Sequence, residues 1–178
     1  MCYNQKFNRL HLFLLLASFL SCSTTTPQRV QQVEGTIREE TFPPSPAGFA
    51  TEILDEINAF RRSGYRCGAR RMVAVPPLAW NEQLADAALR HARDMAQHNH
   101  FSHTGTDGST SGERTRAAGY NWSTVGENIA YGYPDIKSAV KGWMESTGHC
   151  KNIMNPDFKE MGAAAEGQFW SQTLGARR

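Results

Sequence analysis

The sequence WMESTGHCKNIMNP at residues 143–156 places a carboxylate, a histidine and a cysteine within one short segment. Two further segments, FSH at 101–103 and GENIA at 126–130, also put a histidine or a carboxylate beside a turn or the end of an expected element. Two imidazoles and two carboxylates in one cleft could bind a divalent metal such as zinc, or share protons in a hydrogen-bonded network. Because the histidines and the central carboxylate are more than twenty residues apart, spacing alone leaves their convergence open.

Hydrophobic periodicity predicts two helices before these segments. Apolar residues recur at helical spacing from Phe49 to Phe60, and a run of cations followed by Gly64 marks the end of that helix. Asn81 is a good N-cap for a second helix, which should run to about His98 and bury one apolar face. The first part of the folded region is therefore expected to be mainly helical.

Shorter elements follow, and they alternate between helix and strand. A short helix is expected from about Ser111 to Ala118, and Pro134 should open another, whose buried face carries Ile136, Val140 and Trp143. Residues 125–131 are typical of a strand, while 161–165 and 169–174 predict a β-hairpin. The pattern predicts interleaved helices and strands that end in an antiparallel pair.

The N-terminal region predicts export. Residues 1–21 have the positive and apolar regions of a secretory signal peptide, with an apolar run too short for a membrane-spanning helix. FLSC at 19–22 resembles a bacterial lipobox, so Cys22 is expected to carry a lipid; the alternative is an ordinary cysteine near a conventional cleavage site. Residues 22–46 would then be the lipidated cysteine and a disordered tether, and 47–178 the folded domain.

These features imply a place outside the cytoplasm. A lipid at Cys22 would attach the protein to the cell envelope, at the outer membrane if the host has one, because Ser23 rather than Asp follows the cysteine. Removal of Lys6 and Arg9 with the signal changes the formal net charge from +2 to 0. A neutral mature chain has no electrostatic reason to bind nucleic acid, so no nucleic-acid partner is expected.

The cysteine count predicts one disulfide. Cys2 leaves with the signal and Cys22 is the lipid site, so Cys67 and Cys150 remain. A pair of cysteines in an exported protein indicates a disulfide, worth about 4 kcal/mol for a loop of this length. Two buried free thiols are the alternative.

A series of short motifs runs through the folded region. In order they are LAWN at 78–81, HARDMA at 91–96, FSH at 101–103, DG at 107–108, Arg114, AGY at 118–120, GENIA at 126–130, Trp143, GHCKNIMNP at 148–156 and MG at 161–162. This series resembles a bacterial CAP domain, the fold of cysteine-rich secretory proteins, antigen 5 and plant pathogenesis-related proteins, over about 130 of the 178 residues. The resemblance implies an α+β fold, a three-layer α-β-α sandwich with a small, mainly antiparallel central sheet.

The resemblance also implies a surface cleft lined by two histidines and two acidic residues. Matching motifs assign His103, Glu127 and His149 to three of these places. Glu145 is the candidate for the fourth, but it lies two residues after Trp143 where many relatives have the acid three residues after, so a solvent-facing position is the alternative. Some members bind zinc through the two histidines, which makes His103 and His149 the expected metal ligands and zinc the candidate cofactor.

Other polar residues near these motifs have simpler interpretations. His98 and His100 should lie at the exposed end of the second helix, where an imidazolium suits the helix C-terminus. His91 is expected to be a packing residue in the middle of that helix. Arg114 is expected to pair with Asp107 or with a carbonyl group rather than with a substrate.

The function implied by the family is that of a binding module without catalysis. Its ligand would be a divalent metal, a lipid or sterol, or a component of the cell wall, held in the histidine and glutamate cleft. The protein would contact the membrane through its N-terminal lipid.

Two alternatives to a binding module stay open. A cell-envelope hydrolase or peptidase would use His103 or His149 as a base, with Glu127 as the orienting or acidic group. The chain has no HExxH motif, GSTSG at 108–112 has Thr where a nucleophile-elbow Ser would sit, and a disulfide would remove the Cys150 nucleophile. The second alternative is a structural interaction protein of the envelope.

Overall fold

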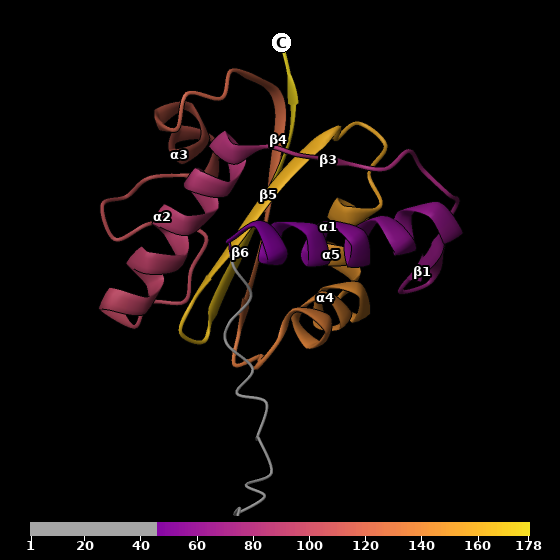
Figure 1. Ribbon diagram of the computed structural model, residues 1–178, viewed down its shortest axis with the longest axis horizontal. Helices are drawn as coiled ribbons and strands as arrows, with labels where there is room; N and C mark the ends of the chain where they lie inside the picture. Colours follow the sequence, from indigo (N-terminus) through magenta and orange to yellow (C-terminus); the bar gives the residue numbers. More distant parts are fainter. Residues whose placement is uncertain (1–45) are drawn as a thin grey trace, which may run out of the picture. The chain divides into compact units, whose positions relative to one another are not determined.

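The computed structural model describes residues 46–178, so the expected signal peptide, the lipid site at Cys22 and the tether lie outside the described residues. The described part belongs to one compact unit that spans residues 41–178. Figure 1 shows its elements in order: α1 (Pro46–Ser63), β1 (Tyr65–Cys67), β2 (Arg70–Met72), β3 (Ala79–Trp80), α2 (Glu82–His98), α3 (Ser111–Ala117), β4 (Trp122–Tyr131), α4 (Ile136–Glu145), α5 (Thr147–Ile153), β5 (Glu160–Glu166) and β6 (Phe169–Arg177).

Helix α2 begins and ends at the expected residues. The side chain of Asn81 accepts hydrogen bonds from the backbone N–H groups of Gln83 and Leu84, at 3.0 and 3.1 Å, and so caps the first turn. Asn99 ends the helix in the left-handed conformation, with a φ of 48°. The predicted second helix is therefore confirmed, and its buried face consists of Leu84, Ala87, Ala88, His91, Ala92 and Met95.

Helix α4 begins two residues later than the proline suggested. Asp135 is the N-cap, because its carboxylate accepts a hydrogen bond from the backbone N–H of Ser138 at 2.7 Å. The predicted buried face of Ile136, Val140 and Trp143 is confirmed. After the extended Ser146 the chain turns into α5, a seven-residue helix that the sequence pattern did not indicate because only Cys150 and Ile153 are buried in it.

The central sheet has the strand order β3-β5-β6-β4. Strands β5 and β6 form the expected antiparallel hairpin, with Glu160 opposite Gly175 at one end and Glu166 opposite Phe169 at the turn. Strand β4 pairs antiparallel with β6 and is three residues longer at its start than predicted, while the two-residue β3 pairs parallel with β5. Since β6 is the neighbour of β4 in this order, β4 forms one edge of the sheet.

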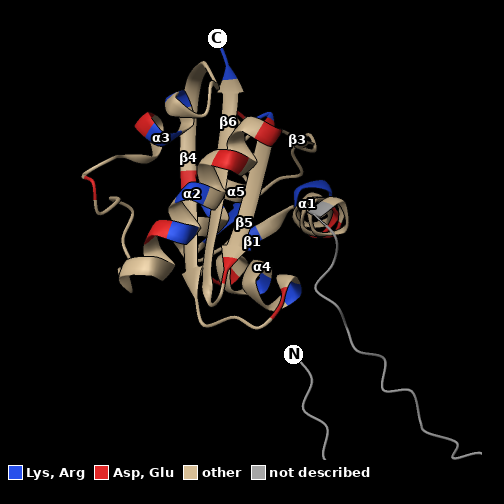
Figure 2. Ribbon diagram, turned by 60° about the vertical axis from the view of Figure 1, so that its left-hand side comes forward, with Lys and Arg blue, Asp and Glu red and all other residues tan. Residues whose placement is uncertain are grey.

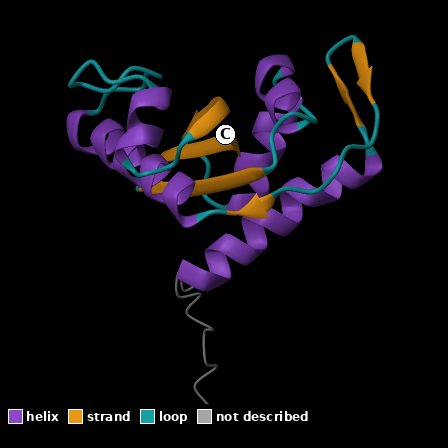
Figure 3. Cartoon of the chain, turned by 90° about the horizontal axis from the view of Figure 1, so that it is seen from above, coloured by secondary structure: helices purple, strands orange, loops and turns teal. Residues whose placement is uncertain are grey.

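Helices cover both faces of this sheet, as the three-layer expectation required (Figures 1 and 3). Helix α2 lies on one face, where its backbone comes so near to Gly162 of β5 that a Cβ there would overlap the backbone of Ala85. The other face is covered by α1, α4 and α5, and the main apolar core lies there between Ile57, Trp143 and Met161. The expected α+β sandwich with a mainly antiparallel sheet is thus confirmed.

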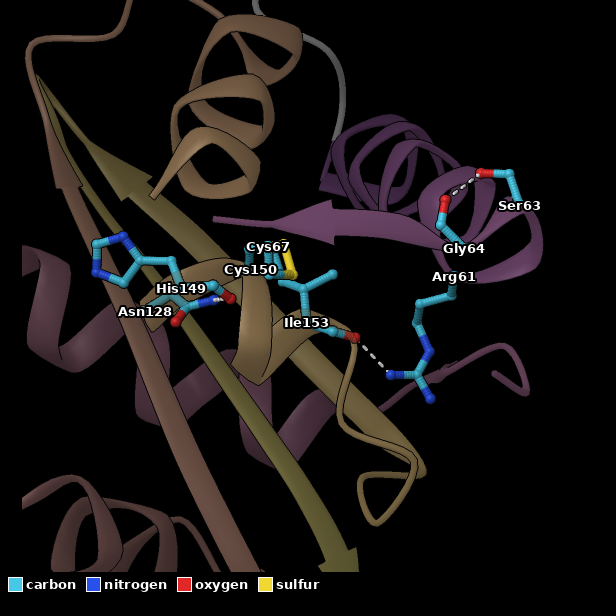
Figure 4. The surroundings of a disulfide bond; sticks show 8 residues. All are labelled: Arg61, Ser63, Gly64, Cys67, Asn128, His149, Cys150 and Ile153. Atoms are coloured by element: carbon cyan, nitrogen blue, oxygen red, sulfur yellow. Dashed lines mark hydrogen bonds between the residues drawn. A yellow bond between two sulfur atoms is a disulfide. The ribbon is translucent and has the colours of Figure 1, made fainter. Parts of the chain in front are cut away.

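The predicted disulfide is confirmed and joins the hairpin β1–β2 to α5. Cys67 and Cys150 are both fully buried, and their Cα atoms are 5.5 Å apart. Close by, the buried guanidinium of Arg61 donates a hydrogen bond to the carbonyl group of Ile153 (Figure 4) and another to that of Asn155. The end of α1 and the hairpin therefore both hold α5 in place.

Candidate functional site

The carboxylate of Glu127 lies at the centre of a buried polar network. Glu127 is on β4, its side chain is only 4% exposed, and each of its oxygens has a partner. Oε1 accepts a hydrogen bond from His103 Nδ1 at 2.8 Å, and Oε2 accepts one from Arg114 Nη2 at 2.7 Å. Burial acts to raise the pKa of Glu127, but the His103 hydrogen bond and the charge of Arg114 outweigh it, so the pKa lies below its ordinary value. Glu127 is therefore ionised at neutral pH.

His103 is oriented by this carboxylate. It lies in the loop between α2 and α3, and its side chain is 57% exposed. An ionised carboxylate can only accept, so Nδ1 of His103 carries the proton that it shares with Glu127. In the neutral ring, Nε2 is then left with the free lone pair, which is the atom that can bind a metal or take up a proton.

Arg114 of α3 connects the loop that carries His103 to the sheet. Its guanidinium donates to the carbonyl oxygens of Ser109 and His103, at 2.7 and 3.0 Å, as well as to Glu127. The expected pairing with a carbonyl is confirmed, but the carboxylate in contact is Glu127 rather than Asp107, because β4 passes beneath α3 and brings a carboxylate thirteen residues away into contact. Arg114 is thus a positioning residue of the site that the sequence alone did not assign.

His91, on the buried face of α2, lies next to this network. It is completely buried, its Nε2 lies 2.9 Å from the carbonyl oxygen of Ser102, and it lies 3.7 Å from Glu127 Oε1. Burial lowers the pKa of His91 below its ordinary value, against the opposing effect of Glu127. The expectation of a buried packing residue is confirmed, and the ring is neutral at pH 7. The ring is not fully satisfied, however, because its buried Nδ1 has no hydrogen-bond partner among the described residues.

His149 lies on α5, the short helix that packs against the edge strand β4. Desolvation lowers the pKa of His149, and the charge of His103 lowers it further. Two asparagines hold α5 against β4: Asn128 Nδ2 donates to the His149 carbonyl at 3.3 Å, and Asn152 Nδ2 donates to Asn128 Oδ1 at 2.9 Å. Figure 4 shows His149 and Asn128 together beside the sheet. Both asparagines stand in the motifs GENIA and GHCKNIMNP, which are the sequence signal that marks them.

Glu145 occupies a different position. Its side chain, at the C-terminal end of α4, is 61% exposed and lies 3.7 Å from Lys141 Nζ. In the part of the chain that the structure describes, no hydrogen bond or ion pair joins Glu145 to His103, Glu127 or His149. The structure therefore joins the side chains of His103 and Glu127 directly. It attaches α5, which carries His149, to β4 through two asparagines, and it leaves Glu145 on the solvent side of α4.

The histidines at the end of α2 lie outside this network. His98 and His100 are both exposed, as expected, and His98 Nδ1 lies 3.1 Å from Asp94 Oδ1. They therefore add no ligand to the pair formed by His103 and His149.

Few side chains in residues 46–178 are placed to bind a metal ion together. No cluster of three or more His, Cys, Asp and Glu side chains in this range is arranged to hold a metal ion. The two oxygens of Glu127 are already engaged by His103 and Arg114, which leaves His103 Nε2 and the ring of His149 as the available donors. Two imidazoles would supply only two of the four protein ligands that a closed zinc site has.

The α-β-α sandwich is the fold that the sequence motifs implied. The chain matches the cysteine-rich secretory protein family, CAP, over residues 54–171, and it belongs to that family. No helix in residues 46–178 is both long and apolar enough to cross a membrane.

Individual relatives agree with this assignment. The chain is 30% identical over 132 residues to the uncharacterized protein YkwD of Bacillus subtilis (strain 168); the matched region covers 73% of this chain and 48% of that protein. It is 34% identical over 97 residues to the uncharacterized membrane protein YlbC of the same strain; the matched region covers 54% of this chain and 28% of that protein. An extracellular protein containing a SCP domain from Bacillus anthracis str. Ames has a similar solved structure, with 30% identity, a TM-score of 0.63 and coverage of 78% of this chain and 45% of that one. The chain thus spans less than half the length of each of these relatives.

Proposed function

We propose that this protein is a lipid-anchored CAP-domain protein outside the cytoplasm, and that it is a binding module whose ligand site is the cleft of His103, Glu127 and His149. The observation that carries the proposal is the 2.8 Å hydrogen bond from His103 Nδ1 to Glu127, which leaves Nε2 of an exposed ring free to bind. The lowered pKa of His149 supports it, because an unprotonated imidazole has a lone pair for a ligand.

The ligand that best suits this pair is a divalent metal such as zinc. His103 and His149 would be the protein ligands, and Glu127 would orient His103 and raise its basicity without contacting the metal. Two protein ligands leave the remaining positions to water or to a polar group of a second ligand, so we expect weak, exchangeable binding. A small molecule, a lipid or sterol, or a cell-wall component could provide that polar group.

Zinc titration of the purified unit 41–178 by calorimetry tests the cleft. Replacement of the ligands, in His103→Ala and His149→Ala, should each abolish measurable binding, whereas Glu127→Gln should weaken it by about 10- to 100-fold. His98→Ala is the matched control, because His98 is also an exposed histidine but lies outside the network. Equal binding by the wild type and His103→Ala would refute a metal site in the cleft.

The proposed location of the protein, outside the cytoplasm and anchored by a lipid, is supported by observations other than the cleft. FLSC at 19–22 resembles a lipobox, the disulfide is typical of oxidising compartments, and the similar Bacillus anthracis protein is described as extracellular. In cells, Cys22→Ala should move the protein from the membrane fraction to the soluble fraction, whereas Cys2→Ala should leave it with the membrane. A Cys22→Ala variant that still fractionates with membranes would contradict acylation at that residue.

One observation favours a hydrolase as the second candidate. The Glu127 and His103 pair has the arrangement of a carboxylate that orients a general base. Cys150 is not available as a nucleophile, because it is bonded to Cys67. Hydrolysis of envelope peptides that is lost in His103→Ala would favour an enzyme over a binding module. The structural envelope role remains the alternative if neither ligand binding nor hydrolysis depends on the cleft.

A further inference from the structure

The arginines of the described residues divide into two groups. Seven have a partner: Arg61 binds carbonyl groups, Arg90, Arg93, Arg114 and Arg177 pair with carboxylates, Arg116 lies over Trp122, and Arg178 binds a carbonyl. The remaining four are exposed, and within residues 46–178 no ion pair, hydrogen bond or ring contact of their side chains is found; they are Arg62, Arg66, Arg70 and Arg71. We call these four the arginine hairpin, because they lie on and beside the hairpin β1–β2.

The arginine hairpin brings like charges together. Arg66 of β1 is directly opposite Arg71 of β2, so both side chains project from the same face of a two-stranded ribbon. Like charges in directly opposite positions destabilise such a pair. No acidic residue occurs in the sequence between Glu56 and Glu82 to relieve this repulsion. The arrangement is therefore electrostatically suited to an anion from outside the chain.

An apolar residue adjoins these charges. Val73, directly after β2, is 75% exposed, more than any other large apolar residue of the described chain. Figure 3 shows the hairpin at the far end of α1, standing away from the strands of the central sheet. Figure 2 shows basic residues on α1, whose last turn contains Arg61 and Arg62. The side chains of these arginines and of Val73 are exposed, so an external surface can reach them.

We propose that the arginine hairpin docks the domain onto a bilayer that contains anionic phospholipids. Opposed arginines suit the phosphate groups of lipids, because a guanidinium can donate two parallel hydrogen bonds to phosphate oxygens. Val73 can bury apolar surface in a lipid interface, which stabilises binding there, whereas a soluble polyanion offers it little apolar surface to contact. This surface shares no residue with the cleft, and the proposal depends neither on metal binding nor on a lipid at Cys22.

Docking would also fix the orientation of the cleft. The disulfide joins Cys67 of the hairpin to Cys150 of α5, which is the neighbour of His149. A hairpin held at the membrane would thus hold α5, and with it one of the two histidines, at a constant distance from the lipid headgroups.

Vesicle binding of the unit 41–178 tests the proposal without the N-terminal lipid, because this unit has its own core and its own disulfide. Sedimentation should show binding to vesicles of phosphatidylcholine with phosphatidylglycerol, little binding to phosphatidylcholine alone, and a decline of binding as salt is raised. The partition coefficient should fall about fivefold in Arg66→Gln and more than about 20-fold in Arg66→Glu.

The variant Arg66→Glu separates docking from folding. It replaces a like-charge pair by a Glu and Arg pair across the hairpin, so its melting temperature should equal or exceed that of the wild type while binding is lost. Arg90→Glu on α2, which makes the same change of charge at an exposed arginine on the other face of the sheet, should bind like the wild type. Equal binding to neutral and anionic vesicles, no binding to either, or undiminished binding by Arg66→Glu would overturn the proposal. So would loss of binding in Arg90→Glu equal to that in Arg66→Glu, since net charge alone would then explain it.

Discussion

His103 and Glu127 are joined by a 2.8 Å hydrogen bond that connects an exposed ring to a carboxylate whose side chain is only 4% exposed. The same carboxylate also binds Arg114, which in turn holds the carbonyl group of His103. The loop, helix α3 and strand β4 are therefore fixed to one another through a single buried anion. Several measurable consequences depend on it.

Loss of the charge at Glu127 should destabilise the fold. In Glu127→Gln the side chain keeps its size, but the guanidinium of Arg114, which is 8% exposed, no longer has a compensating charge. Breaking a buried ion pair in this way costs about 3–5 kcal/mol of the free energy of unfolding. Urea unfolding measures this change. Glu145→Gln, at an exposed carboxylate 3.7 Å from Lys141, should change stability by less than about 0.5 kcal/mol. An equal effect of both substitutions would contradict the role of Glu127.

The effect of Glu127→Gln should depend on pH. The pKa of Glu127 is lowered in the folded protein, so the folded state binds fewer protons at this group than the unfolded state does. Its contribution to stability is complete above the unfolded pKa, near 4.5, and is lost as pH falls through the folded pKa. The difference in stability between wild type and Glu127→Gln should therefore be constant near pH 7 and shrink below pH 4.5. A difference that stayed constant down to pH 2 would show that the ionised carboxylate is not its source.

The coupling between the two histidines can be measured directly. Desolvation and the charge of His103 both lower the pKa of His149, so removal of that charge in His103→Gln should raise the pKa of His149 toward its ordinary value of 6.5. NMR titration of the His149 ring resonances gives this pKa. His98→Gln is the control and should leave it unchanged, because no effect of His98 on His149 is found. An identical His149 pKa in wild type and His103→Gln would mean that the rings do not meet in one cleft.

The disulfide should contribute strongly to stability and to the position of α5. Cys67 and Cys150 are separated by 83 residues. In the chain-entropy model, a disulfide that closes a loop of that length restricts the unfolded chain and so adds about 4 kcal/mol to the free energy of unfolding. We expect Cys67→Ala/Cys150→Ala to lose up to that amount in urea unfolding under oxidising conditions. Resonances of His149 should shift in this variant, whereas those of His98 should not, because only His149 lies on α5. Equal stability of the wild type with and without a reductant would contradict this expectation.

Much of the fold could be predicted from local signals. Asn81 as an N-cap, the apolar face of α4 and the hairpin β5–β6 are each encoded within a few neighbouring residues, because capping groups and periodic burial act over one or two turns. The short elements were missed for the same reason. Strands β1, β2 and β3 have two or three residues each, too few for a period to be visible, and α5 buries only two residues.

The sequence by itself determined the order of motifs, the pair of cysteines left to form a disulfide, and the chemical groups at His103, Glu127 and His149. Only the tertiary structure decided how these groups relate. It made Arg114 the partner of Glu127, left Glu145 beside Lys141 on the solvent side of α4, and set Arg66 opposite Arg71 without an acidic partner in the described chain. The reason is that local propensities fix elements, whereas contacts between distant side chains depend on how β4, α3 and α5 pack around one sheet edge.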